Sequence, residues 1–218
     1  MVTTSQIVRK YIESMPAVHE CLGKGLISYG SLAKMLLPKI EGDMGKGVKL
    51  SAIVMALRRY SETMTRKYSS KLPHEYIQEV SVKSNILDVL VQKSTTLYPK
   101  LRKLYEKIDP AKGDILNVVQ GDYETAIVTN MRHEEKLSDI FDDETILWRE
   151  KKLAMISVKI SKEYVYTPGV ILKMVQSLNW EGVNIFEIVS TLTEINFIVS
   201  EKDATKGYEA LQTLLRKD

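Results

Sequence analysis

The stretch from residue 154 to residue 214 constrains the fold most, because its hydrophobic period changes several times in a fixed order. An alternating apolar run at 155–160 predicts a strand. A loop ending in Thr167-Pro168-Gly169 then leads into an amphipathic run that stops at Gly182. Two β-rich runs, 185–190 and 194–199, and a second amphipathic helix opened by Asp203 follow. This β-α-β-β-α order is most of a ferredoxin-like unit.

The same stretch carries the motifs T-P-G-V, V-N-I, I-V-S-T and I-N-F-I-V-S-E-K-D-A. In this order and at these spacings they resemble the regulatory ACT domain of aspartate kinases. ACT domains are small βαββαβ modules that bind amino acids. The resemblance covers nearly the whole stretch and implies ligand-controlled regulation. It does not imply kinase chemistry, because the chain shows no kinase domain.

The resemblance implies a ligand site at the first strand-to-helix turn, extending to a neighbouring ACT domain. A free amino acid has a carboxylate, which the N–H groups at a helix start bind well. A glycine and a proline at this turn allow close approach and fix its geometry, and the second strand would supply groups for the ligand's ammonium and its polar end. The predicted ligand set is Thr167, Pro168, Gly169, Val170, Asn184 and Ile185. The alternative is an ordinary capped turn that binds nothing.

One departure bears on the identity of the ligand. Aspartate kinases have S-T-S-E after the second strand, whereas this chain has V-S-T-L at 189–192. The missing acidic residue weighs against lysine or threonine as the ligand.

Residues 76–150 repeat the strand and helix order without repeating the motifs. Strands are expected at 77–83, 85–93 and 145–150, a helix after Thr95 or Thr96, a hairpin around Gly121-Asp122 and a charged helix at 132–141. We interpret this segment as a degenerate ACT-like domain paired with the one at 151–218, as in aspartate kinases. The second unit lacks residues for a fourth strand, which is either missing or supplied by a segment such as 77–83.

Residues 1–75 are predicted to be helical. Thr4 or Ser5 can cap a first helix, a short helix follows at 27–37, and the Gly-rich, charged segment 38–48 is predicted to be an exposed loop. The run 49–67 has an apolar face and an outer face with arginines, which is similar to the helix-turn-helix of winged-helix proteins. The candidate DNA-binding residues are Lys49, Arg58, Arg59, Arg66 and Lys67. The alternative is a helical cap with solvated arginines.

The charge distribution agrees with nucleic-acid binding at one end, since residues 1–78 carry a formal charge of +6 and the remainder −3. No apolar run approaches the roughly 18 residues of a membrane span, and no secretory signal is recognised, so we expect a cytoplasmic protein.

The single cysteine excludes an internal disulfide. His19, His74 and His133 lack partners at metal-ligand spacing and are expected to be solvated or singly hydrogen-bonded. No acid–base or nucleophile pair is present, so we predict no enzyme, no metal and no cofactor.

The predicted fold class is α+β, with a helical, helix-turn-helix or winged-helix-like domain at 1–75 and two tandem ferredoxin-like ACT domains at 76–150 and 151–218. The whole resembles archaeal predicted regulators of amino-acid metabolism. This resemblance implies a transcription regulator with an amino-acid effector and a homodimer or larger homo-oligomer formed through the ACT sheets. The alternative function is a stand-alone regulatory subunit that docks on a biosynthetic enzyme and does not bind DNA.

Overall fold

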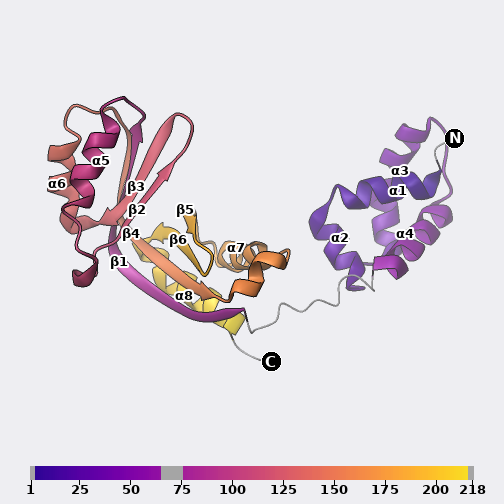
Figure 1. Cartoon of the computed structure of the whole chain (residues 1–218). Helices are drawn as coiled ribbons and strands as arrows, with labels where there is room; N and C mark the ends of the chain where they lie inside the picture. Colours follow the sequence, from indigo (N-terminus) through magenta and orange to yellow (C-terminus); the bar gives the residue numbers. More distant parts are fainter. Residues whose placement is uncertain (1–2, 65–75, 216–218) are drawn as a thin grey trace. The chain divides into compact units, whose positions relative to one another are not determined.

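The computed structural model describes residues 3–64 and 76–215 (Figure 1). Contacts divide the chain into two compact units, Met1–Pro73 and His74–Asp218, which we call the helical unit and the sheet unit. The predicted boundary at residue 75 lies outside the described residues.

The helical unit is built from amphipathic helices around one apolar core. Between residues 3 and 64 these are α1 (Thr4–Glu13), α2 (Pro16–Gly23), α3 (Tyr29–Met44) and α4 (Leu50–Met64). Thr3, rather than Thr4 or Ser5, caps α1 in a capping box with Gln6. On α4, Ile53 and Leu57 are fully buried and Arg59 is exposed, which confirms the predicted inner and outer faces.

The predicted loop at 38–48 is wrong. Helix α3 continues through Pro38 to Met44 and ends where Gly45 adopts a φ of 63°. The fully buried side chains of Leu36 and Ile40 lie on either side of Pro38, and their packing offsets the hydrogen bond that proline removes. Only residues 45–49 connect α3 to α4, and residues 3–64 include no β-strand.

The described part of the sheet unit contains one six-stranded antiparallel sheet in the order β2-β3-β1-β4-β6-β5. Its strands are β1 (Ile77–Gln92), β2 (Leu116–Gln120), β3 (Glu124–Asn130), β4 (Ile146–Ile160), β5 (Ile185–Ser190) and β6 (Glu194–Ser200). The helices are α5 (Leu97–Tyr105), α6 (Glu134–Ile140), α7 (Val170–Trp180) and α8 (Ala204–Gln212), with short 3-10 turns at Pro110–Lys112, Met131–His133, Lys162–Tyr166, Glu201–Asp203 and Thr213–Leu215.

Two long strands, β1 and β4, run through the whole sheet and divide it into two halves. In the N-terminal half, residues 86–92 of β1 pair with β3 and with residues 146–153 of β4. In the C-terminal half, residues 77–83 of β1 pair with 155–160 of β4, which also pairs with β6. Each half therefore has the strand order of a ferredoxin-like unit, and segment 77–83 supplies the fourth strand that the C-terminal half lacks. The predicted boundary between residues 150 and 151 falls inside β4.

The sheet bends where its halves join. Asn85 and Lys152 both have positive φ, 57° and 55°, and the β1–β4 register shifts between Lys83 and Ile86. The sequence pattern separates the runs on either side of these residues, but the ladder continues past them. Each long strand therefore replaces two predicted strands.

Because of the bend, each half of the sheet has one face covered by helices and an opposite face that contributes to a core shared by both halves. Helices α5 and α6 cover one face of the N-terminal half through Leu87, Val89 and their neighbours. Helix α8 lies close to the C-terminal half at Gly207, where a Cβ would stand 2.6 Å from Ile156 Cδ1. The opposite faces of the two halves share a second core cluster with members on both: Ile86, Ile115, Val128, Leu153, Met155 and Ile198.

Candidate functional site

The turn before α7 holds four of the predicted ligand residues. Gly169 takes a φ of 92°, which favours glycine, and it is the N-cap of α7. Val170 is buried and anchors the first turn in the core. Among the described residues no side chain caps this helix start. Because the first N–H groups of a helix have no partner within the helix, this end of α7 can receive an anion.

The hydroxyl group of Thr167 is hydrogen-bonded within the protein and is not free to bind a ligand. Its Oγ1 lies 3.2 Å from the Tyr76 hydroxyl, to which it donates, and 3.4 Å from the Glu163 carbonyl. Thr167 therefore fixes the turn, and the backbone amides of α7 are the groups left to bind a ligand.

A carboxylate of the protein itself lies beside the equivalent helix start in the N-terminal half. Glu144 accepts hydrogen bonds from Ser94 Oγ at 2.7 Å and Thr96 Oγ1 at 2.6 Å, just before α5, and its carboxylate lies 3.0 Å from Lys100 Nζ. The Thr96 and Ser94 hydrogen bonds, with Lys100, hold the pKa of Glu144 below its usual range. An internal carboxylate thus lies beside the start of α5, bound to hydroxyl groups rather than to the helix amides, and within the described ranges neither α5 nor α7 has a side-chain cap.

The remaining predicted ligand residues, Asn184 and Ile185, lie at the far end of α7. The helix has 11 residues and is therefore about 16 Å long at 1.5 Å per residue, which separates these two residues from Gly169. Asn184 is exposed and Ile185 half-buried. Within the C-terminal half of one chain, the six predicted ligand residues therefore do not form a single site.

Large exposed apolar side chains gather on the same elements. Leu172 and Trp180 on α7 are 57% and 84% exposed. Others lie on the preceding turn, on α7 and on the edge strand β5: Val165, Tyr166, Ile171, Phe186 and Ile188. An edge strand beside an apolar helix surface is typical of a protein interface.

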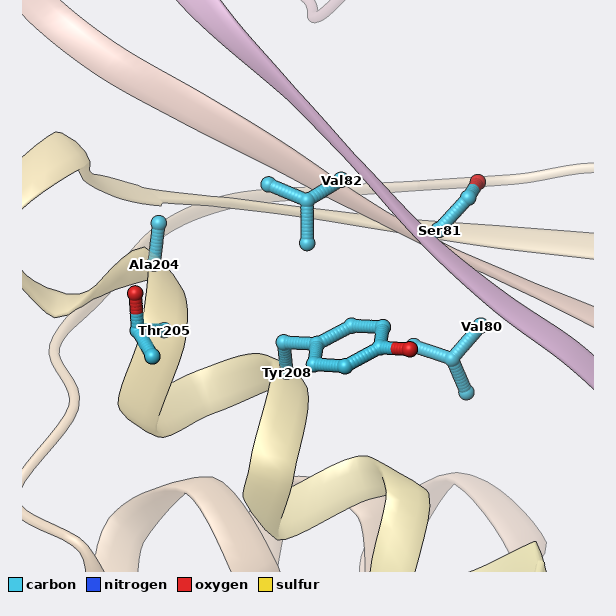
Figure 2. Close-up of a pocket in the computed structure, with 6 residues that line it drawn as sticks. All are labelled: Val80, Ser81, Val82, Ala204, Thr205 and Tyr208. Atoms are coloured by element: carbon cyan, nitrogen blue, oxygen red, sulfur yellow. The ribbon is translucent and has the colours of Figure 1, made fainter.

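Two cavities lie away from the predicted ligand set. Figure 2 shows the first, of about 370 Å³, where the Tyr208 ring of α8 extends toward Val80 and Val82 of β1. The second, of about 360 Å³, lies between the halves and is lined by Asp88, Trp148 and Glu187 among others. Sequence reasoning missed this acidic cavity, and the only signal was an aspartate inside the apolar run ILDVLV.

The described DNA-binding candidates lie along α4 of the helical unit. Lys49, Arg58 and Arg59 are exposed at the start and on the outer face of α4. Arg58 Nε is 3.4 Å from Glu62 Oε1. Arg66 and Lys67 lie outside the described residues.

Of the two expectations for the histidines, solvated or singly hydrogen-bonded, His133 does not meet the first. His133 is buried, and its Nε2 lies 2.8 Å from Asp114 Oδ1. Asp114 also accepts a hydrogen bond from the Asp109 amide and pairs with Arg132, so its pKa is far below the usual range. This cluster fixes the loop between α5 and β2 against the start of α6.

No group of three or more His, Cys, Asp or Glu side chains within residues 3–64 and 76–215 is placed to hold a metal ion. In the same ranges, every helix is too short or too polar to cross a membrane.

Comparison with known proteins gives matches to solved structures alone, since no family model and no curated protein matches the chain. The sheet unit has the fold of the regulatory, ACT-type domains of aspartate kinases. The ligand-free regulatory subunit of aspartate kinase from Thermus thermophilus aligns with a TM-score of 0.54 at 14% identity, over 65% of this chain and 99% of that one.

Whole aspartate kinases match over about a third of their length. The allosteric enzyme from Clostridium acetobutylicum aligns with a TM-score of 0.54 at 16% identity, covering 68% of this chain and 36% of that one. Aspartokinase III from E. coli, in complex with lysine and aspartate, has a TM-score of 0.50 at 11% identity, covering 68% and 35%.

Proposed function

We propose that this protein is a non-catalytic, amino-acid-sensing regulator whose effector carboxylate binds at the start of α7. The observation that carries the proposal is the contrast between the two helix starts of the sheet unit. Ser94 and Thr96 hold the carboxylate of Glu144 beside the start of α5, while α7 starts at Gly169 without a side-chain cap from the described residues. The similarity to regulatory subunits and domains of aspartate kinases supports the same function.

A second copy of the chain would complete the site. Two α7–β5 edges related by a two-fold axis run antiparallel, so the partner subunit's Asn184 and the partner subunit's Ile185 approach Gly169. The exposed apolar side chains on α7 and β5 supply surface for this pairing. The dimer thus brings together residues that lie at opposite ends of a helix about 16 Å long in one chain.

The helical unit supplies the output, which we propose to be binding to DNA, making the protein a transcription regulator of amino-acid metabolism. Lys49, Arg58 and Arg59, with Arg66 and Lys67, are the residues for phosphate or base contacts. An effector that binds one dimer arrangement more tightly than another shifts the population, with a typical coupling of about 1–3 kcal/mol.

A thermal-shift screen of the full chain against the twenty amino acids tests the sensing. One amino acid or a small group should raise the melting temperature, since a ligand that binds only the folded state at 100 times its Kd stabilises it by about 2.7 kcal/mol. The same amino acid should change DNA affinity in a gel-shift titration. No stabilisation by any of the twenty would contradict the sensing function.

The alternative output is docking on an amino-acid biosynthetic enzyme as a regulatory subunit. The alignment over 99% of a Thermus regulatory subunit favours it specifically. Two experiments distinguish DNA binding from enzyme docking. A docking subunit gives no gel shift of DNA at low salt, and it makes its enzyme sensitive to inhibition by an amino acid.

A further inference from the structure

The cavity between the two halves of the sheet has no role in the proposed effector site, with which it shares no residue. It has a volume of about 360 Å³. Asp88, Leu90 and Ala126 come from the N-terminal half, and Phe186 and Glu187 from β5 in the C-terminal half. The bend in β1 and β4 brings these residues together, although β5 is separated from the strands of Asp88 and Ala126 by two or more strands in the sheet order.

Two carboxylates in this cavity each have one oxygen without a hydrogen-bond partner in the described part of the chain. The Asp88 residue is only 3% exposed, and neither its Oδ1 nor Glu187 Oε2 has a hydrogen-bond partner among the described residues. Burial, aided by the nearby Glu187, raises the pKa of Asp88 to about 7, and burial also raises the pKa of Glu187. None of the described residues that line the cavity is basic. Unpaired buried carboxylates are costly, so a cation that pairs with both would stabilise this arrangement.

Aromatic side chains form part of the cavity wall. Trp148 and Phe186 stack with their ring centroids 6.1 Å apart and their planes at 24°. They are 37% and 38% exposed, so part of each ring can be reached by a ligand. Aromatic faces attract organic cations and pack against alkyl chains.

We propose that this cavity binds a small organic cation with a primary ammonium group. The ammonium donates hydrogen bonds to Asp88 and Glu187, and the aliphatic part lies against Trp148 and Phe186. A bare metal ion fits less well: Glu124 also lines the cavity, but no three described His, Cys, Asp or Glu side chains are placed to hold a metal ion together.

The test uses the fluorescence of Trp148 in the full chain. Since the chain has 2 tryptophans, the Trp180→Phe variant leaves Trp148 as the only one. At pH 8, titration with n-pentylamine should give a saturable change, and 1-pentanol of equal chain length should give none. Asp88→Asn and Glu187→Gln, made in the same background, should each weaken pentylamine binding at least tenfold.

Melting temperatures separate loss of the site from loss of the fold. The two variants should melt no lower than their background, because each removes a buried unpaired charge. Equal responses to pentylamine and pentanol, unchanged affinity in both variants, or displacement of pentylamine by Ca²⁺ would overturn the proposal. Neither variant replaces a residue of the predicted effector set, so the thermal-shift screen with amino acids tests that site separately and either proposal can fail alone.

Discussion

Two buried carboxylates of the sheet unit have opposite surroundings. Glu144 accepts hydrogen bonds from Ser94 and Thr96 and pairs with Lys100. Asp88 has an oxygen without a partner. The first therefore stabilises the fold, and the second destabilises it unless a cation is bound.

Removing the partnered carboxylate should be costly. Glu144→Ala leaves two hydroxyls without their acceptor and removes the buried one of the two carboxylates that pair with the largely buried Lys100, so the free energy of unfolding should fall by about 3 kcal/mol in urea titrations at pH 7. The matched control is Asp143→Ala, which removes an exposed partner of the same lysine. This control should reduce the free energy of unfolding by less than about 1 kcal/mol, and equal effects of both variants would contradict the role of Glu144.

Asp88 should make stability depend on pH. Its pKa is about 7 when folded against 3.8 ordinarily, so between these values the folded state binds more protons than the unfolded state. Stability should fall as pH rises through this window, by at most about 1.4 kcal/mol per pH unit. Asp88→Asn should remove that part of the slope and be more stable at pH 8. An unchanged slope in the variant would show that Asp88 is not buried as described.

At the scale of elements, the bend between the two halves predicts that valine and glycine at residue 152 have effects on stability opposite to their usual effects within a strand. Lys152 has a φ of 55°, where a β-branched residue is strained by about 1–2 kcal/mol and glycine is not. Lys152→Val should lower the free energy of unfolding by about that amount, and Lys152→Gly should change it little.

Lys159 is the matched control, an exposed position elsewhere on β4. There Lys159→Gly should cost about 0.5–1 kcal/mol and Lys159→Val should be nearly neutral. Denaturant unfolding of the four variants measures both comparisons. The same order of stabilities at both positions would rule out the bend.

Elements with a clear period could be predicted from the sequence, and those that depend on distant contacts could not. The stripe of Leu97, Leu101 and Leu104 predicts α5, and all three are buried. The glycines and charges of 38–48 predicted a loop, but the end of α3 is helical because Ile40 packs in the core. The motif T-P-G predicted the turn at Gly169, but Asp88 and Glu187 lie in one cavity only because the sheet bends.

At the scale of the whole molecule, the two compact units predict separable functions. A fragment of residues 74–218 should fold, as judged by circular dichroism, and bind the effector with a Kd within about twofold of that of the full chain. DNA binding should require residues 1–73. Loss of effector affinity in a folded fragment would show that the helical unit contributes to the site.

DNA affinity is the second property of the whole molecule. Neutralising Lys49, Arg58 and Arg59 as glutamines should weaken DNA binding and reduce its salt dependence by about 0.9 in log–log slope for each phosphate that is no longer neutralised. Lys24→Gln on α2 is the control and should leave the slope unchanged. Anisotropy titrations at several salt concentrations measure both, and equal slopes for the two proteins would favour enzyme docking.

The most direct test of the central claim is calorimetric titration of the identified amino acid into the Ile171→Glu and Ile171→Gln variants. Ile171 is partly exposed in the first turn of α7, where a glutamate supplies an internal carboxylate and complements the helix dipole. If the amides at this helix start bind the effector carboxylate, Ile171→Glu should lose at least tenfold in affinity relative to the similarly sized Ile171→Gln, which removes the same apolar side chain from the proposed dimer surface. Equal affinities would show that the effector binds elsewhere.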